Sequence, residues 1–208
     1  MTTARPVLFI QGAGAGTHDE WDVRLVDSLR RELGSEWEVH YPHMPDEDDA
    51  RYATWGPAIR WELAGLGDGA VVVGHSVGGT LLVHTIAQHP PDRPLGGIVL
   101  LAAPFVGEGG WPGDGLEATS DLGSRLPAGV AVHVFHGVED ETVPPSHADL
   151  YAAAIPQARV YGLPGRDHQI DDDLREVASV ITAEPTRQAL NGHRSSVARP
   201  AGGSRRRR

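Results

Sequence analysis

The chain has 208 residues, of which 40% are hydrophobic and 22% charged, values typical of one globular domain and not of a fibrous or disordered chain. No apolar run approaches the roughly 18 residues that span a bilayer, and no apolar leader follows Met1, so we expect a cytoplasmic protein. The absence of cysteine excludes disulfides, thiolate metal sites and a cysteine nucleophile, and the absence of lysine excludes a lysine Schiff base.

The formal net charge of −10 is unevenly distributed along the chain. Residues 184–208 contain seven arginines and one acid, whereas residues 1–183 contain eleven basic and twenty-seven acidic residues, a net charge of −16. We therefore expect one domain over residues 1–183 and a disordered arginine-rich tail over residues 184–208. The acidic domain should repel nucleic acid and anionic membranes, so neither is expected as a partner. The tail fits either a solvated arm or a segment that binds acidic surfaces.

Short apolar segments alternate with longer amphipathic segments from the first residues to about residue 183. Strands are expected over residues 7–10, 37–41, 71–73, 97–102, 130–135 and 158–161. Helices are expected over residues 21–33, 51–66 (with Pro57 inside), 76–88, 146–154 and 171–181. The inward face of the first helix is expected to carry Trp21, Leu25, Leu29 and Leu33. This alternation predicts an α/β domain with about six mostly parallel strands and helices on both faces of the sheet.

The segment that follows the third expected strand has the pattern of a serine nucleophile, Gly74-His75-Ser76-Val77-Gly78. In such a nucleophile elbow the serine sits at a strained apex between a strand and a helix, and the glycines avoid clashes there. The pattern alone is weak in a chain with 26 glycines, and Ser76 could instead lie in an ordinary turn. Its position between an expected strand and an expected helix favours the nucleophile.

A serine nucleophile needs a histidine base and an acid that orients the histidine. Asp140 follows the fifth expected strand and His168 follows the sixth, at the edge where active sites of open parallel sheets form. The chain order of serine, acid and histidine is that of the elbow hydrolases. Glu139 or Glu141 could replace Asp140 as the acid, whereas Asp167 is expected to be a turn residue. Other histidines near strand ends or on helices are expected to be structural, namely His75, His84, His133 and His136.

These residue types predict acyl-transfer chemistry. Ser76 would attack a carbonyl carbon, His168 would accept the serine proton, and Asp140 would hold the imidazole in the correct tautomer. The oxyanion that develops needs preorganised donors, for which backbone N–H groups are suited. We expect these donors to be the N–H of Val77, next to the serine, and that of Ala13, in the glycine-rich loop after the first strand.

Residues 12–16 also fit a dinucleotide-binding turn, because they follow a strand and precede a helix. However, Thr17 stands where that fingerprint needs its third glycine, and the second strand ends without an acid for a ribose, so no cofactor is expected. No metal is expected either, because two candidate ligand pairs lack a third ligand at a recognisable spacing: His40 with His43, and His147 with Asp149.

Over residues 6–183 the sequence resembles the α/β-hydrolase superfamily, through the glycine-rich first loop and the Gly-His-Ser turn. More narrowly, it is similar to the small, lidless serine hydrolases of the retinoblastoma-binding-protein type. The cue for that type is Met44-Pro45-Asp46 followed by Ala50-Arg51 and Trp55. One departure is Gln11-Gly12, where the superfamily often has His-Gly.

The resemblance implies a three-layer α/β-hydrolase fold without a lid domain, with Ser76, Asp140 and His168 as the catalytic triad. The ordered serine, acid and histidine lead us to expect a carboxylesterase-like serine hydrolase that cleaves a small ester, thioester or amide through an acyl-enzyme; the resemblance itself does not define the substrate. A missing lid implies an open cleft, whose walls would include His18, Trp111 and the loop around Met44, although these side chains fit a packing role equally well. Two other functions stay open: a scaffold protein that keeps the fold with little turnover, and an interaction module driven by the tail.

Overall fold

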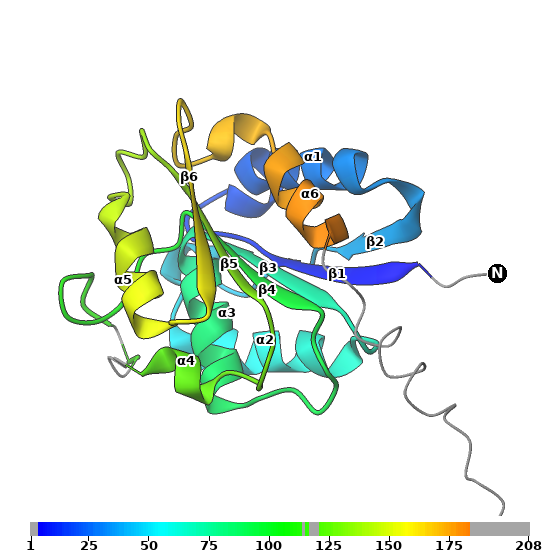
Figure 1. The fold of residues 1–208 in the computed structure, drawn as a ribbon, viewed down its shortest axis with the longest axis horizontal. Coiled ribbons are helices and arrows are strands. Elements are labelled where there is room, and N and C mark those ends of the chain that lie inside the picture. Colours follow the sequence, from blue (N-terminus) through cyan, green and yellow to red (C-terminus); the bar gives the residue numbers. More distant parts are fainter. Residues whose placement is uncertain (1–3, 114, 117–120, 184–208) are drawn as a thin grey trace, which may run out of the picture.

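The computed structural model describes residues 4–113, 115–116 and 121–183, in which one sheet lies between two layers of helices (Figure 1). The predicted domain boundary at residue 183 and the predicted disorder of residues 184–208 lie outside the described part and stay predictions. Among the described helices, none is both long enough and apolar enough to cross a membrane.

Six parallel strands form the sheet, which confirms the predicted strand number and the predicted preference for parallel pairing. The strands are β1 (Arg5–Ile10), β2 (Trp37–His40), β3 (Val71–His75), β4 (Gly97–Leu101), β5 (Val132–Gly137) and β6 (Ala158–Leu163). Their order across the sheet is β2-β1-β3-β4-β5-β6, so the chain reverses its direction of travel after β2. Strand β6 forms one edge, and most of its residues are partly or fully exposed.

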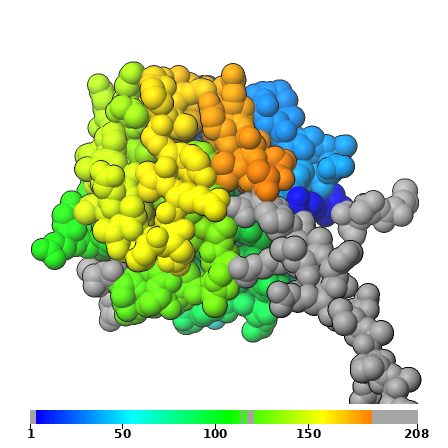
Figure 2. Space-filling view, viewed as in Figure 1, coloured from blue at the N-terminus to red at the C-terminus, as the bar shows by residue number. Residues whose placement is uncertain are grey.

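Helices cover both faces of the sheet, as predicted. They are α1 (Val23–Leu33), α2 (Tyr52–Gly65), α3 (Ser76–Gln88), α4 (Leu122–Arg125), α5 (Ser146–Ala154) and α6 (Arg175–Ala183). Side chains of α1 and α6 pack on one face, and those of the other four helices pack on the opposite face. In the space-filling view, α5, β6 and α6 (yellow to orange) occupy much of the surface (Figure 2).

Alternate residues of each inner strand feed two separate hydrophobic cores. In β1, Leu8 and Ile10 belong to the core beneath α2 and α3, whereas Val7 and Phe9 belong to the core beneath α1 and α6. All four side chains are fully buried. Burying each one stabilises the fold by about 1.5–3 kcal/mol relative to exposure, so the sheet register is strongly specified on both faces.

The start of the first helix differs from the prediction. Residues Thr17–Asp22 form a π-helical turn before α1, and Trp21 is 49% exposed instead of facing the core. Asp22 takes the inward position and is fully buried, because its carboxylate accepts a hydrogen bond from the Gly12 N–H at 2.7 Å. The hydrogen bond to the Gly12 N–H, after β1, therefore places Asp22 on the inward face in place of Trp21.

Three further boundaries differ from the prediction. The last helix begins at Arg175 and not at Asp171, because residues 170–172 have φ angles of 50–54° and cannot continue a right-handed helix. Helix α4 was not predicted, because a single turn of four residues carries too little periodicity to detect. Helix α2 continues through Pro57, which lacks an N–H for the Ala53 carbonyl; both residues are exposed, so water can solvate that carbonyl.

The strand order places a topological switch point between β1 and β3. The connection after β1 leads to α1 on one face, whereas the connection after β3 leads to α3 on the other face. In open parallel sheets ligands bind at the carboxyl edge where two such connections diverge. The loop after β1 and the start of α3 meet at this edge.

A buried histidine in α3 gives the fold a pH dependence. His84 is 2% exposed, and burial, together with the charge of Arg125, lowers the pKa of its side chain to about 4. In the unfolded chain this side chain has an ordinary histidine pKa of about 6.5. Between the two pKa values, the unfolded state therefore binds a proton that the folded state does not bind. As the pH falls from about 6.5 to 4, the free energy of unfolding should therefore fall by on the order of 3 kcal/mol through His84.

We expect His84→Leu to remove this part of the pH dependence, as measured by urea unfolding at pH 7.5, 5.5 and 4.5. His40→Gln is the matched control, because the His40 side chain is exposed. Parallel pH profiles for wild type and His84→Leu would contradict the assignment.

Candidate active site

Ser76 stands at the turn between β3 and α3 in a left-handed backbone conformation. Its φ angle is 49°, a region that non-glycine residues adopt at a cost of about 1–2 kcal/mol. Ser76 is 9% exposed, so it is largely enclosed by its neighbours. This is the geometry that the Gly-x-Ser-x-Gly pattern predicted.

Two glycines allow the backbone to come close enough for this turn. A Cβ on Gly74 would lie 2.5 Å from the Cα of Gly79, in the first turn of α3. A Cβ on Gly78 would overlap the carbonyl oxygen of Gln11, at the end of β1. The turn therefore packs backbone against backbone on both sides, which fixes Ser76 relative to the loop after β1.

The structure brings together the three residues of the predicted triad, which lie far apart in the sequence. His168 Nε2 lies 3.0 Å from Ser76 Oγ, and His168 Nδ1 lies 2.8 Å from Asp140 Oδ2. Both distances are within the 2.6–3.2 Å range expected of a nucleophile, its base and the group that orients the base. The neighbouring acids Glu139 and Glu141 are exposed.

The carboxylate of Asp140 is held by donors on every side. The backbone N–H groups of Thr142 and Val143 both donate to its Oδ1 at 2.8 Å, and His136 Nε2 lies 3.2 Å from its Oδ2. Burial alone would raise the pKa of Asp140, but the hydrogen bonds from His136, His168 and Val143 outweigh burial and hold that pKa well below its usual range. Asp140 therefore stays a carboxylate and keeps accepting from His168.

Glu47 holds the loop that follows β1. Its carboxylate accepts hydrogen bonds from the Gln11 side chain (2.7 Å) and from the N–H groups of Gly16 (2.7 Å) and His18 (3.2 Å). Burial alone would raise the pKa of Glu47, but these hydrogen bonds outweigh it and lower the pKa. In the glycine-rich loop, the N–H groups of Gly12 and Gly16 thus bind carboxylates of the chain itself, those of Asp22 and Glu47.

The predicted oxyanion donors belong to two segments that border Ser76. Val77 is the second residue of α3, where backbone N–H groups have no acceptor within the helix. Ala13 is exposed and follows Gly12, whose backbone is so near that an added Cβ would lie 3.3 Å from the Ser76 Cβ. The two segments therefore border the serine, and the donor roles themselves stay predictions.

Of the expected cleft residues, Met44 is buried, whereas His18 and Trp111 are partly exposed. Met44 is 3% exposed and belongs to the core, so it packs and does not line a cleft. The His18 ring stacks between Tyr41 and His43, with centroid distances of 4.2 and 4.4 Å. Trp111 is 37% exposed and contacts the edge of His147.

Two histidines outside the triad, His147 and His40, have polar partners of their own. His147 Nδ1 accepts the N–H of Phe105 at 2.7 Å, and His40 lies 2.7 Å from Glu62. Within the described ranges, no three potential ligands come together around one point as a metal site would require. His75 and His136, which were expected to be structural, lie next to the predicted triad: His75 contacts the backbone of His168 and His136 contacts Asp140.

Sequence reasoning missed Asp22 and Glu47, which hold the loop after β1. For Asp22 a signal exists: residues 22, 25, 26, 29 and 33 follow helical spacing, so an acid lies on the apolar stripe of α1. For Glu47 no such signal exists, because it stands among other acids in the segment Asp46-Glu47-Asp48-Asp49.

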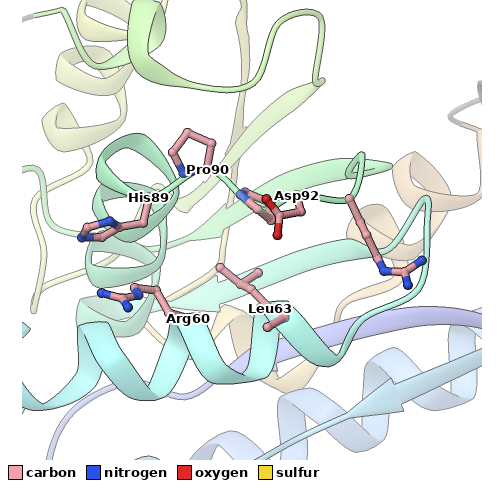
Figure 3. Close-up of a pocket in the computed structure, with 8 residues that line it drawn as sticks. Arg60, Leu63, His89, Pro90 and Asp92 are labelled. Atoms are coloured by element: carbon pink, nitrogen blue, oxygen red, sulfur yellow. The ribbon is translucent and has the colours of Figure 1, made fainter.

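A pocket of about 570 Å³ lies elsewhere on the molecule, between α2 and the segment after α3. Arg60 and Leu63 line it from α2, and His89, Pro90 and Asp92 line it from the other side (Figure 3). His89 follows the last residue of α3, whereas Ser76 is the first, so the 13-residue helix separates the two by about 20 Å. This pocket cannot present a substrate to Ser76.

The fold, with a serine, a histidine and an aspartate at its carboxyl edge, defines an α/β-hydrolase. Residues 7–174 match the family model described as serine hydrolase, so the chain belongs to the serine hydrolase family and is a hydrolase. The predicted fold and superfamily are thereby confirmed, and within the described residues no lid domain is present. The narrower likeness to the retinoblastoma-binding-protein type stays a prediction. No curated protein matches the chain by sequence.

Solved structures with the same fold include several hydrolases. Est1E from Butyrivibrio proteoclasticus is 15% identical with a TM-score of 0.64, over 93% of this chain and 90% of that one. The carbazole-degradation serine hydrolase CarC is 16% identical with a TM-score of 0.66, over 90% and 92%. The ydeN gene product of B. subtilis is 20% identical with a TM-score of 0.65, over 87% and 98%. At these identities the likeness shows the fold alone.

The close approach at the elbow predicts the effect of adding one methyl group. We expect Gly78→Ala to lower the free energy of unfolding by about 1–3 kcal/mol, because the Gln11 carbonyl must move away. Gly65→Ala is the matched control: nothing lies within 4 Å of a Cβ at the end of α2, so alanine should stabilise by about 0.5–1 kcal/mol. Urea unfolding measures both, and equal stability of the two variants would contradict the packing described.

Proposed function

We propose that this serine hydrolase cleaves small carboxylic esters, or related thioesters and amides, through an acyl-enzyme on Ser76. One observation carries the proposal: the continuous hydrogen-bond chain from Ser76 Oγ through His168 to Asp140. A serine hydroxyl is a weak nucleophile until a base removes its proton, and this chain supplies the base and the group that orients it.

In the first half-reaction, the Ser76 oxygen bonds to the substrate carbonyl carbon while its proton passes to His168 Nε2. The carbonyl oxygen becomes an oxyanion, which the N–H groups of Val77 and Ala13 stabilise. His168 then gives its proton to the leaving alcohol, thiol or amine, and the acyl group stays on Ser76. Asp140 stabilises the imidazolium that forms in between.

In the second half-reaction, water replaces the leaving group. His168 takes a proton from the water as its oxygen bonds to the acyl carbon, and it returns that proton to Ser76 when the carboxylic acid departs. Ester substrates receive support from similar structures, among them Est1E with ferulic acid bound and an esterase domain of a Rhodothermus marinus protein. A deformylase from Pseudomonas putida shares the fold, so amides belong in the same test.

A neutral fluorophosphonate probe tests the nucleophile and its partners together. We expect it to label the wild-type chain, to leave Ser76→Ala unlabelled, and to label Asp140→Asn more slowly by up to about 10⁴-fold, because asparagine favours the wrong histidine tautomer. Peptide mapping of the adduct and hydrolysis of 4-nitrophenyl acetate provide the measurements.

Glu139→Gln and Glu141→Gln are the matched controls for Asp140→Asn, because they neutralise exposed acids next to it in the sequence. Both should be labelled at the wild-type rate. Labelling of Ser76→Ala would exclude Ser76 as the nucleophile. A labelled wild type that releases no 4-nitrophenol, while another protein co-purifies with it, would favour the scaffold function.

The edge of the sheet that carries Ser76 is strongly acidic. Exposed carboxylates lie on the loops after four of the strands: Asp19, Glu20, Asp46, Asp48, Asp49, Glu139, Glu141, Asp167 and Asp171. A surface lined by one sign of charge repels ligands of the same sign. Neutral and cationic substrates are therefore favoured over anionic ones.

We expect an ester whose acyl chain ends in a carboxylate to have a kcat/KM roughly tenfold below that of a neutral ester of equal length. The difference should shrink in 0.5 M NaCl, because salt screens exposed charges. It should also shrink in a Glu139→Gln/Glu141→Gln double variant, with the neutral ester unaffected. Equal rates for both esters at low salt would contradict the electrostatic argument.

A further inference from the structure

A second histidine lies beside the triad, and the reaction described above does not use it. His75 is the last residue of β3 and directly precedes Ser76. Its side chain is 1% exposed, and the carboxylate that it contacts, Asp22, is fully buried. Burying charged groups is costly unless they are paired, so the protonation states of this buried histidine and buried acid matter for the structure.

Both ring nitrogens of His75 face atoms that can only accept hydrogen bonds. Nδ1 lies 2.9 Å from Asp22 Oδ2, and Nε2 lies 3.0 Å from the main-chain carbonyl oxygen of His168. A neutral imidazole carries one N–H and can donate to only one of them. Two acceptors with an ionised Asp22 require two N–H groups, which is the imidazolium form.

The charges around the ring favour the same form. Burial alone would lower the pKa of His75, but the charge and hydrogen bond of Asp22, the carbonyl of His168 and the charge of Asp140 outweigh burial and raise that pKa. The other titratable ring close by is that of His168, whose centroid lies 5.0 Å away. The charges of two carboxylates, Asp22 and Asp140, thus favour the protonated ring.

We propose that His75 is a buried imidazolium and that the His75–Asp22 ion pair positions both the base and the oxyanion loop around Ser76. Through Nε2–H, His75 binds the backbone of His168. Through Asp22, whose Oδ2 also accepts the Gly12 N–H at 2.7 Å, it binds the residue before Ala13. His75 is itself joined to Ser76 by the chain. One ion pair therefore fixes three segments that reach the site from β1, β3 and β6.

The pair acts through other residues and touches no reacting atom, so it has a positioning role. The inference rests on the proposed function for what is being positioned, but the ionisation of His75 does not depend on turnover. A charge-assisted hydrogen bond is roughly twice as strong as a neutral one, which suits a link that must hold during the reaction.

Nitrogen-15 NMR of the full chain, labelled at histidine, measures the ionisation directly. At pH 8.5, where exposed histidines are neutral, we expect His75 to show protons on both Nδ1 and Nε2. His75→Asn assigns its signals. Asp22→Asn should remove the Nδ1 proton, because the asparagine amide then donates to Nδ1. A wild-type His75 with an unprotonated Nδ1 at pH 8.5 would overturn the proposal.

Kinetics with 4-nitrophenyl acetate test the positioning role. We expect His75→Asn to lower kcat roughly a hundredfold with little change in KM, because it breaks the link to His168. Asp22→Asn keeps the hydrogen bonds but loses the charge, so its kcat should fall to an intermediate value. Glu62→Gln, which discharges the exposed partner of His40, is the matched control and should match the wild type.

The outcomes separate this inference from the proposed function. An unchanged kcat in a folded His75→Asn, verified by circular dichroism, would overturn the positioning role while leaving Ser76 as nucleophile. Persistent labelling of Ser76→Ala by the fluorophosphonate would overturn the proposed function, whatever the NMR of His75 shows. If His75→Asn fails to fold, the wild-type spectrum and the kinetics of Asp22→Asn still decide the question.

Discussion

The turn between β3 and α3 depends on contacts between backbones that leave no room for side chains. Gly78 lies against the carbonyl of Gln11 and Gly74 lies against Gly79, so the start of α3 is fixed to the ends of both β1 and β3. The left-handed conformation of Ser76 is stable only because these contacts over-determine it. These contacts consequently fix three features relative to one another: the loop after β1, the proposed nucleophile and the dipole of α3.

Around this turn the charges are arranged as two imidazole–carboxylate pairs. His168 with Asp140 faces the surface, and His75 with Asp22 lies behind it. In the proposed reaction the first pair transfers protons to and from the reacting groups, whereas the second pair is buried. The backbone of His168 belongs to both pairs, since its ring contacts Asp140 and its carbonyl contacts His75. In the proposed mechanism, His168 transfers protons and His75 has a positioning role.

The sequence predicts the sheet, five of the six main helices and the three residues that meet at its edge, because each produces a local signal. Apolar strands, helical spacing and the glycines around Ser76 are visible within short windows. Glu47 and the exact role of Asp22 depend on contacts across 31 and 53 residues, which no window contains. Trp21 was placed in the core for the same reason: its hydrophobicity is local, but the polar partner that turns the helix is not. The left-handed residues after His168 also lack a signal, since none of them is glycine.

Those left-handed residues have a consequence for local unfolding near His168. Ile170, Asp171 and Asp172 together carry a conformational cost of several kcal/mol, by the order of 1–2 kcal/mol for each. Their conformation is held by neighbours, among them the Ser28 hydroxyl that accepts the Leu174 N–H at 3.0 Å. This conformational cost favours opening of the segment that follows His168, and hydrogen exchange would measure that opening separately from unfolding of the sheet. The proposed activity and the stability of the sheet therefore depend on different sets of contacts.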